Sequence, residues 1–252
     1  MENWRTFLTE SESGGLNPKI EEIADEMFDI NDWKGWPVYK VVIEQVQNEG
    51  NGVGVKLIWD GPGRPHGPVV VGHVNISDHY EGRCFPDKMV WVVTHSKMGD
   101  ATDDIKGWGP LLYEVAIEWA SKYDGLMPDR STVSKDARRV WQKYFERSDL
   151  NKEPIDLDPN EIGDMRGPNS NGKIEYFSAS NEWVDVEQLT PKEPDDDCDV
   201  SSSFNNDSWS SKSSNEVEGT KWSEDPLGYI YSKSSQPTIK YLADKDLIED
   251  KT

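Results

Sequence analysis

A glycine turn directly before a helical segment is the part of this 252-residue chain best suited to hold a ligand. It reads Lys-Gly-Trp-Gly-Pro at residues 106–110 and leads into residues 111–123, whose apolar side chains recur at helical spacing. Glycines let backbone N–H groups approach an anion closely, and the positive end of the helix dipole favours negative charge. The turn therefore predicts a cradle for a phosphate or pyrophosphate. Taken alone, the same pattern is also typical of a tight turn that starts a helix with proline in its first turn.

The segments around this turn strengthen the ligand interpretation. A strand-like run at residues 89–96 precedes it, and a second helical segment follows at residues 134–145. Together they resemble the acyl-coenzyme A site of the GNAT superfamily of N-acetyltransferases, whose signature is Arg or Gln, two residues, Gly, any residue, then Gly or Ala. Residues 134–141 correspond to the family's Asn-x-x-Ala-x-x-x-Tyr helix. The resemblance implies acetyl-CoA as cofactor, held by Val93, Thr94, Gly107, Trp108 and Gly109.

Two positions depart from the family pattern where chemistry would take place. Asp104 stands at the Arg or Gln position, and its carboxylate would repel a pyrophosphate. Trp141 replaces the tyrosine that protonates the leaving thiolate, and an indole N–H is not a general acid. Tyr144 is therefore expected as the acid and His95 as the base, with Tyr113 and His73 as alternatives. The competing interpretation is that these side chains are simply packed.

Composition narrows the classes of partner. The chain has 48 acidic and 27 basic residues, a net charge of −21, which argues against binding to nucleic acid or to an anionic membrane. No segment has the roughly 20 apolar residues of a membrane span, and the N-terminus lacks the apolar core of a secretory signal. The charge favours basic surfaces as partners.

Cysteine and histidine spacing predicts neither a disulfide framework nor a metal site. Cys84 and Cys198 are far apart in the sequence, which fits a reducing compartment. His66, His73 and His79 precede Cys84 at spacings that match no standard zinc pattern. We therefore expect no bound metal.

Hydrophobic patterning predicts an α/β protein, more exactly an α+β fold with a mixed sheet. The expected order is a meander of strands, a helix, a strand and a helix, which is the order that the GNAT resemblance requires. Ser134 is the expected N-cap of the second helix, and Ser131 is an alternative start. The expected strands are residues 38–47, 52–59, 69–76, 89–96 and 125–128, with closing strands at 174–177 and 182–186, and a short terminal helix covers 238–248.

Charge divides the chain near residue 150. The first 150 residues carry a net charge of −8 and the remaining 102 carry −13. We expect an amphipathic leader and helix at 1–32, a GNAT-like domain at 33–190, an acidic Ser/Asn-rich linker at 191–225, and a C-terminal segment with a short helix at 226–252. The linker is too polar and too charged to offset its ordering entropy, so the C-terminal extension is expected to have little order.

The first ten residues resemble the capsid-targeting leader of internal head proteins in large tailed bacteriophages. Trp4, Phe7 and Leu8 share one helical face, and Leu8-Thr9-Glu10 matches the triplet after which a maturation protease cuts. The resemblance implies a phage protein located in the host cytoplasm or in the virion, with a protein of the phage or of its host as partner. It leaves three functions open. The first is an acyl-CoA-dependent N-acetyltransferase, the second is a non-catalytic virion component that binds neighbouring subunits through its C-terminal tail, and the third is a packaged effector that acts on a host protein by binding alone. A terminal helix that packs on its own domain is the simpler interpretation of these residues.

Overall fold

The computed structural model describes the backbone of residues 15–34, 38–46, 52–61, 67–78, 89–99, 105–129, 133–154 and 226–252, and of three short strands between 165 and 185. The expected leader at 1–10 and linker at 191–225 lie outside these residues, as do Cys84, Asp104 and Cys198. Within them the chain is a mixed α/β protein, which confirms the expected class.

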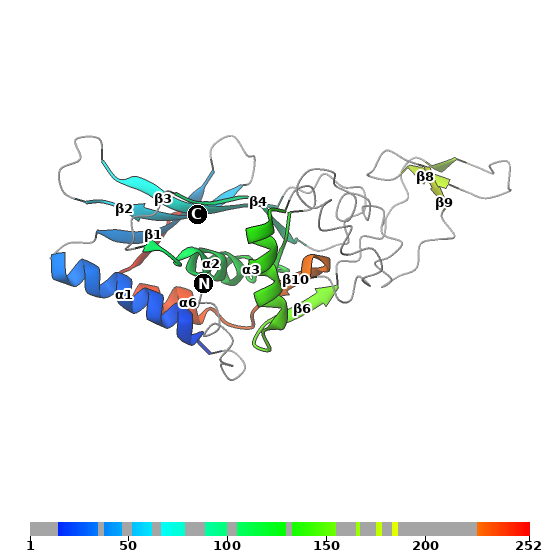
Figure 1. Cartoon of the computed structure of the whole chain (residues 1–252). Helices are drawn as coiled ribbons and strands as arrows, with labels where there is room; N and C mark the ends of the chain where they lie inside the picture. The colour runs from blue at the N-terminus through cyan, green and yellow to red at the C-terminus, as the bar shows by residue number, and fades with distance from the viewer. Residues whose placement is uncertain are drawn as a thin grey trace.

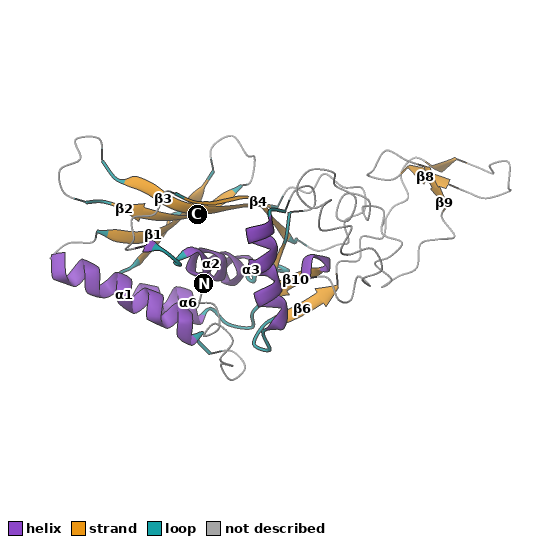
Figure 2. Ribbon diagram, in the orientation of Figure 1, coloured by secondary structure: helices purple, strands orange, loops and turns teal. Residues whose placement is uncertain are grey.

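An eight-stranded mixed sheet is the centre of the molecule (Figures 1 and 2). Its strand order is β11-β1-β2-β3-β4-β5-β10-β6. The first four strands along the chain form an antiparallel meander, and they agree closely with the strands expected from the sequence. These four strands are β1 (Tyr39–Gln45), β2 (Val53–Trp59), β3 (Val69–Ser77) and β4 (Trp91–Met98).

Three helices cover one side of this sheet (Figure 1). Helix α2 (Gly109–Ala120) packs directly on β2 and β3, and every residue from Pro110 to Ala120 is buried. Helices α1 (Pro18–Lys34) and α6 (Pro237–Asp244) contact α2 and each other. Helix α2 is almost entirely apolar because it is covered by the sheet on one side and by α1 and α6 on the other, so the hydrophobic effect favours apolar residues all round it.

Strand β4 is joined to β5 (Leu126–Met127) through α2, and the two strands are parallel. Helix α3 (Lys135–Glu146) follows, and its N-cap is the expected Ser134, whose hydroxyl accepts a hydrogen bond from the Ala137 amide at 3.2 Å. The α2 helix begins two residues earlier and ends three residues earlier than expected, because the chain turns at residues 121–124 before Gly125, which has a φ of +111°.

The C-terminal part corrects the expectation about the closing strands. Strands β6 (Asn151–Pro154) and β10 (Tyr229–Ser232) complete the main sheet, and β10 lies between β5 and β6. The expected closing strands do form, as β8 (Glu175–Phe177) and β9 (Trp183–Asp185), but they pair with β7 (Met165–Arg166) in a separate sheet. Strands of three residues are too short for their pattern to distinguish one sheet from another.

Residues 226–252 belong to the same sheet as the first part of the chain. A 3-10 helix (Pro226–Gly228) leads into β10, α6 follows, and β11 (Ile248–Asp250) pairs in parallel with β1 at the opposite edge. The terminal helix is shorter than the expected 238–248, because the chain turns at Asp246, whose φ is +55°, and Ile248 joins the sheet.

Candidate functional site

The glycine turn lies directly before α2 and is open on one side. Gly107 has a φ of +95°, a conformation that side chains with a Cβ rarely adopt. A Cβ built on Gly107 would meet no atom within 4 Å, so this side of the turn is open among the described residues. Gly109 begins the helix and Pro110 follows in its first turn. The turn therefore places the positive end of the α2 dipole beside open space.

The side chain of Trp108, expected as a cofactor-binding residue, is buried beneath the turn and packs on α1 and β1. Its side chain is 1% exposed, and its indole Nε1 donates a hydrogen bond to Glu26 Oε2 of α1 at 3.0 Å. Its ring meets Tyr39 of β1 edge to face, with centroids 5.1 Å apart. The buried indole anchors the turn to α1 and β1. The Trp108 backbone is engaged as well, because its N–H donates to the Ile105 carbonyl at 3.2 Å and its carbonyl accepts from the Leu111 amide at 3.0 Å, so the structure does not leave Trp108 free to bind a cofactor.

Strand β5 pairs with β4 over two residues only. Only Trp91 pairs with Leu126 and Val92 with Met127. A register shift then occurs between β3 and β4: Asn75 pairs with His95 and Ile76 pairs with Val93, which leaves Thr94 as the extra residue of a β-bulge. From Val93 to Met98, β4 is paired only with β3 among the described strands. Two expected cofactor residues, Val93 and Thr94, thus lie directly after the two residues of β4 that pair with β5.

The side chain of Tyr113 contacts the part of β4 that follows the bulge. Its hydroxyl donates a hydrogen bond to Ser96 Oγ of β4 at 2.8 Å, and the residue is 6% exposed. Burial raises the pKa of Tyr113 above its usual 10, and the negative charge of nearby Asp129, just after β5, raises it further.

The structure places the two expected catalytic side chains in different surroundings. Tyr144 is fully buried in α3, and its hydroxyl donates a hydrogen bond to the Pro110 carbonyl at 3.1 Å. Burial and the charge of Glu114 raise the pKa of Tyr144 well above 10. His95 is exposed and stacks on His73 of β3, with ring centroids 5.1 Å apart.

Strand alternation explains why these two residues do not meet. Ser96 faces α2, because it bonds to Tyr113, so its neighbour His95 points to the other side of the sheet. Tyr144 lies on the α2 side, where it supports the first turn of that helix. The geometry therefore does not bring Tyr144 and His95 together as an acid and base.

Trp141, at the family's tyrosine position, is a packing residue. It is 1% exposed and lies between Tyr113, at a centroid distance of 5.7 Å, and Tyr231 of β10, at 5.1 Å. This aromatic cluster fills the space between α2, α3 and β10.

Sequence reasoning missed a buried cluster of five charged side chains that joins α2 to the C-terminal segment. It consists of Glu114 and Glu118 of α2, Arg147 and Asp149 after α3, and Lys233 after β10. Arg147 makes two hydrogen bonds to Glu114, of 2.6 and 2.9 Å. Burial alone would raise the pKa of Glu114, but the charges of Arg147 and Lys233 outweigh it and lower the pKa to about 2.

Glu118 of this cluster also caps helix α6. Its two carboxylate oxygens accept hydrogen bonds from the backbone amides of Thr238 and Ile239 at 3.0 and 2.9 Å. Lys233 lies 3.1 Å away. Burial raises the pKa of Glu118, although Lys233 opposes this shift. The sequence did contain a signal: two glutamates spaced i, i+4 interrupt the apolar run of α2, and buried charges need partners.

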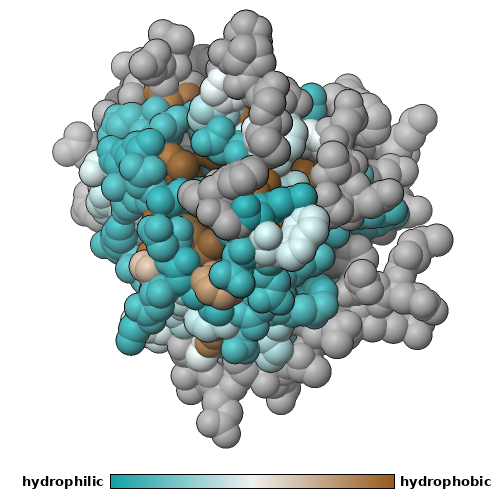
Figure 3. All heavy atoms as spheres, turned by 90° about the vertical axis from the view of Figure 1, so that its left-hand side faces the viewer, coloured by the Kyte–Doolittle hydropathy of each residue, from teal (hydrophilic) through white to brown (hydrophobic). Residues whose placement is uncertain are grey.

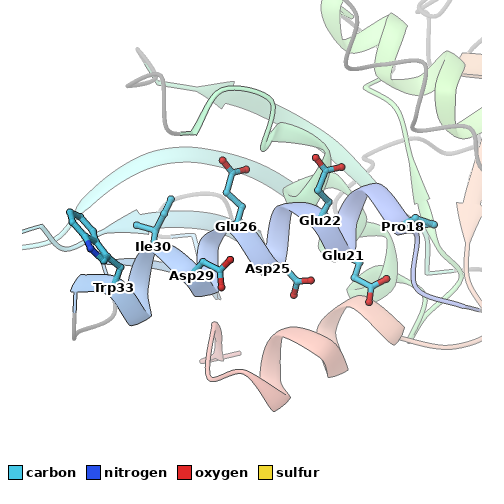
Figure 4. A pocket seen from close by; sticks show the side chains of 8 residues that line it. All are labelled: Pro18, Glu21, Glu22, Asp25, Glu26, Asp29, Ile30 and Trp33. Carbon is cyan, nitrogen blue, oxygen red and sulfur yellow. The ribbon is translucent and has the colours of Figure 1, made fainter.

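A shallow hollow runs along the exposed side of α1 (Figure 4) and is lined largely by carboxylates. Glu21 and Asp25 point toward α6, while Glu22 and Glu26 point to the other side of the helix. Asp25 is already engaged, because it accepts a hydrogen bond from Tyr241 at 2.6 Å and pairs with Lys245 at 3.1 Å.

The face shown in Figure 3 is largely hydrophilic, with separate hydrophobic spots.

Two negative findings apply to the described part of the chain. It contains no group of three or more His, Cys, Asp or Glu side chains placed to hold a metal ion. None of its helices combines the length and the apolar character that crossing a membrane requires.

No protein-family model, no curated protein and no solved structure matches this chain.

Proposed function

We propose that this protein is a GNAT-like, acyl-CoA-dependent N-acetyltransferase of a tailed bacteriophage. The observation that carries the proposal is that β5 pairs with only two residues of β4, while the far end of β4, at Met98, lies beside the open glycine turn at the start of α2. Acyl-CoA consists of a pyrophosphate and a pantetheine arm with two amides that ends in a thioester, so it needs both features at once. The order of four strands, α2, β5 and α3 also agrees with the order that the resemblance predicts.

The dimensions fit this ligand. From Met98 back to the bulge at Thr94 the strand covers roughly 13 Å at about 3.3 Å per residue. A pyrophosphate at Gly107 and Gly109 would lie at one end of this stretch, and the pantetheine amides would pair with the β4 edge as a strand does. The thioester would then lie between Ser96 and the bulge.

Calorimetric titration with acetyl-CoA tests this proposal. A carboxylate beside the cradle repels the pyrophosphate, so Gly107→Glu is expected to abolish binding. Gly67→Glu is a matched control, because Gly67 also has a positive φ, +81°, and open space around its Cα. Binding that survives in the control and disappears in Gly107→Glu supports the site. Absence of binding to the wild-type protein at millimolar acetyl-CoA would refute the proposal.

A second function, that of a non-catalytic virion-associated protein, is favoured by the position of the acidic region. Pro154 of β6 pairs with Tyr229 of β10. The two ends of the intervening sequence, residues 155–228, are therefore attached to adjacent positions of the sheet. Residues 155–225 contain 18 acidic and 5 basic side chains. They form an insertion between two paired strands, and such an insertion can bind a basic surface of a neighbouring subunit without disturbing the core.

Fractionation of phage particles separates the two functions. A virion component is expected to sediment with purified particles at a fixed number of copies, and deletion of residues 156–225 is expected to release it. A protein that binds acetyl-CoA and remains in the soluble fraction of infected cells would refute the structural role.

A further inference from the structure

We infer that residues 226–252 are a separable docking segment, and that residues 18–154 carry a specific binding site for it. The docking segment consists of the 3-10 helix, β10, α6 and β11, and it is drawn from orange to red in Figure 1. Its own contacts, and not its covalent connection through residues 155–225, hold it in the fold. The same site can therefore take this segment from a second copy of the chain, whether or not acyl-CoA binds elsewhere.

The first part of the site is the position between β5 and β6. Strand β10 is antiparallel to both neighbours, with four residues paired to β6 and Tyr231 paired to Leu126 of β5. Tyr231 is fully buried, and its ring centroid lies 5.1 Å from that of Trp141 in α3. Main-chain pairing and a buried side chain together supply affinity here, as they do when a peptide strand adds to a sheet.

The second part of the site is a buried position for one lysine. Three carboxylates and one guanidinium surround it, with a formal charge of −3 + 1 = −2; they belong to Glu114, Glu118, Asp149 and Arg147. The Lys233 ammonium lies 2.5, 3.1 and 3.7 Å from oxygens of the three carboxylates, in that order. Carboxylates removed from water need a cation, so this part of the site selects a positive charge at residue 233.

The third part of the site holds both ends of α6. At its start, the Glu118 side chain caps the helix and the Glu118 backbone carbonyl accepts a hydrogen bond from Gln236 Nε2 at 2.8 Å. At its end, Asp25 of α1 binds Tyr241 and Lys245. Helix α6 is therefore fixed to α2 and to α1 by separate side chains.

The last part of the site is the edge of β1 that β2 does not occupy. Strand β11 pairs there in parallel over three residues, and Leu242 and Leu247 before it are buried in the core. Strand β11 lies at one edge of the sheet and β10 lies next to the opposite edge. Because its contacts are spread over four places, no single contact holds the docking segment.

The connection through residues 155–225 adds little to this binding. A tether contributes an effective concentration, which is on the order of millimolar for short linkers and falls as the linker lengthens. Pro154 and Tyr229 are adjacent in the sheet, so the tether spans no distance that the segment would otherwise fail to cross. We therefore expect the docking segment to stay bound when the tether is cut.

Cutting the folded full-length protein tests this expectation. The recognition sequence of a site-specific protease replaces residues 206–211, and the purified protein is cut once. The two fragments should elute together in gel filtration at about 1 µM and unfold in one cooperative transition. Fragments that separate or aggregate at this concentration would overturn the inference.

Exchange of the segment shows that the site is specific. A synthetic peptide of residues 221–252, labelled at its N-terminus outside the docking segment, is added in excess to the cut protein. Urea below the unfolding transition speeds release of the native fragment, and fluorescence anisotropy follows entry of the labelled peptide. We expect entry that excess unlabelled peptide reverses. Failure of the peptide to enter would contradict a separable segment.

Lys233 provides the matched control, tested in the peptide so that the receiving protein stays wild type. Lys233→Met should weaken peptide binding at least roughly 100-fold, because the buried carboxylates lose their cation. Lys240→Met removes the same charge from an exposed position of α6 and should change the affinity by less than about threefold. Equal affinities of the two variant peptides would refute a site that selects a lysine.

Discussion

The ammonium group of Lys233 lies 2.5 Å from Glu114 Oε1, and the side chains of both residues are almost completely buried. Lys233 follows β10 and Glu114 belongs to α2, so this ion pair joins the end of the chain to the central helix. Asp149 and Glu118 also lie within 4 Å of the same ammonium group. The ion pair explains how residues 226–252 are held against the central helix.

Replacing Lys233 should therefore weaken the whole fold. Lys233→Met removes the cation and leaves buried carboxylates without compensation, which costs about 3–5 kcal/mol of unfolding free energy. Lys240→Met, an exposed position on α6, is the control and should change stability by less than about 0.5 kcal/mol. Urea unfolding followed by tryptophan fluorescence measures both, and equal stability of the two variants would contradict the role of the cluster.

Acid should weaken the same cluster through Glu114. The pKa of Glu114 in the folded protein is about 2, below its usual value of 4.5, so its contribution is fully present above about pH 4.5. That contribution, on the order of 3 kcal/mol, is lost as the pH falls from 4.5 toward 2. Urea unfolding of wild type and Glu114→Gln across this range is the measurement. The stability difference between them should shrink with decreasing pH, and a constant difference would argue against an ionised Glu114.

The insertion between β6 and β10 should be removable. Because Pro154 and Tyr229 are paired partners, a Gly/Ser linker of about eight residues, which reaches roughly 15 Å, can replace residues 156–225. The shortened protein should keep its far-ultraviolet circular dichroism, corrected for length, and a cooperative thermal transition. Loss of the transition would mean that the core needs residues of the insertion.

Asn31 should be important for the start of the sheet. Its side-chain oxygen accepts hydrogen bonds from the amides of Val38 and Tyr39 at 2.9 and 2.8 Å, and its amide donates to the Tyr39 carbonyl at 2.8 Å. Asn31→Ala leaves these buried backbone groups without partners, at a cost of about 1–3 kcal/mol for each group that water does not reach. Asp32→Ala, at the exposed neighbouring position, is the control. A melting temperature of Asn31→Ala equal to that of the control would contradict this role.

The amino-acid sequence by itself determined the local elements of the core. Alternating and helical apolar patterns located β1 to β5, α2 and α3 to within a few residues, and Ser134 identified the start of α3 correctly. It also located the glycine turn, because the positive φ of Gly107 and the proline in the first turn of α2 are local requirements. These features depend on residues close together in the chain.

Only the tertiary structure decided which distant segments meet. The membership of β10 and β11 in the main sheet, and the separate sheet of β8 and β9, depend on pairing between residues far apart in sequence. The partners of Glu114 and Glu118 are likewise supplied by segments that follow α3 and β10. Periodicity records which face of an element is apolar but not which element covers it, so neither the position of Tyr113 beside Ser96 nor the burial of Tyr144 could be read from the sequence.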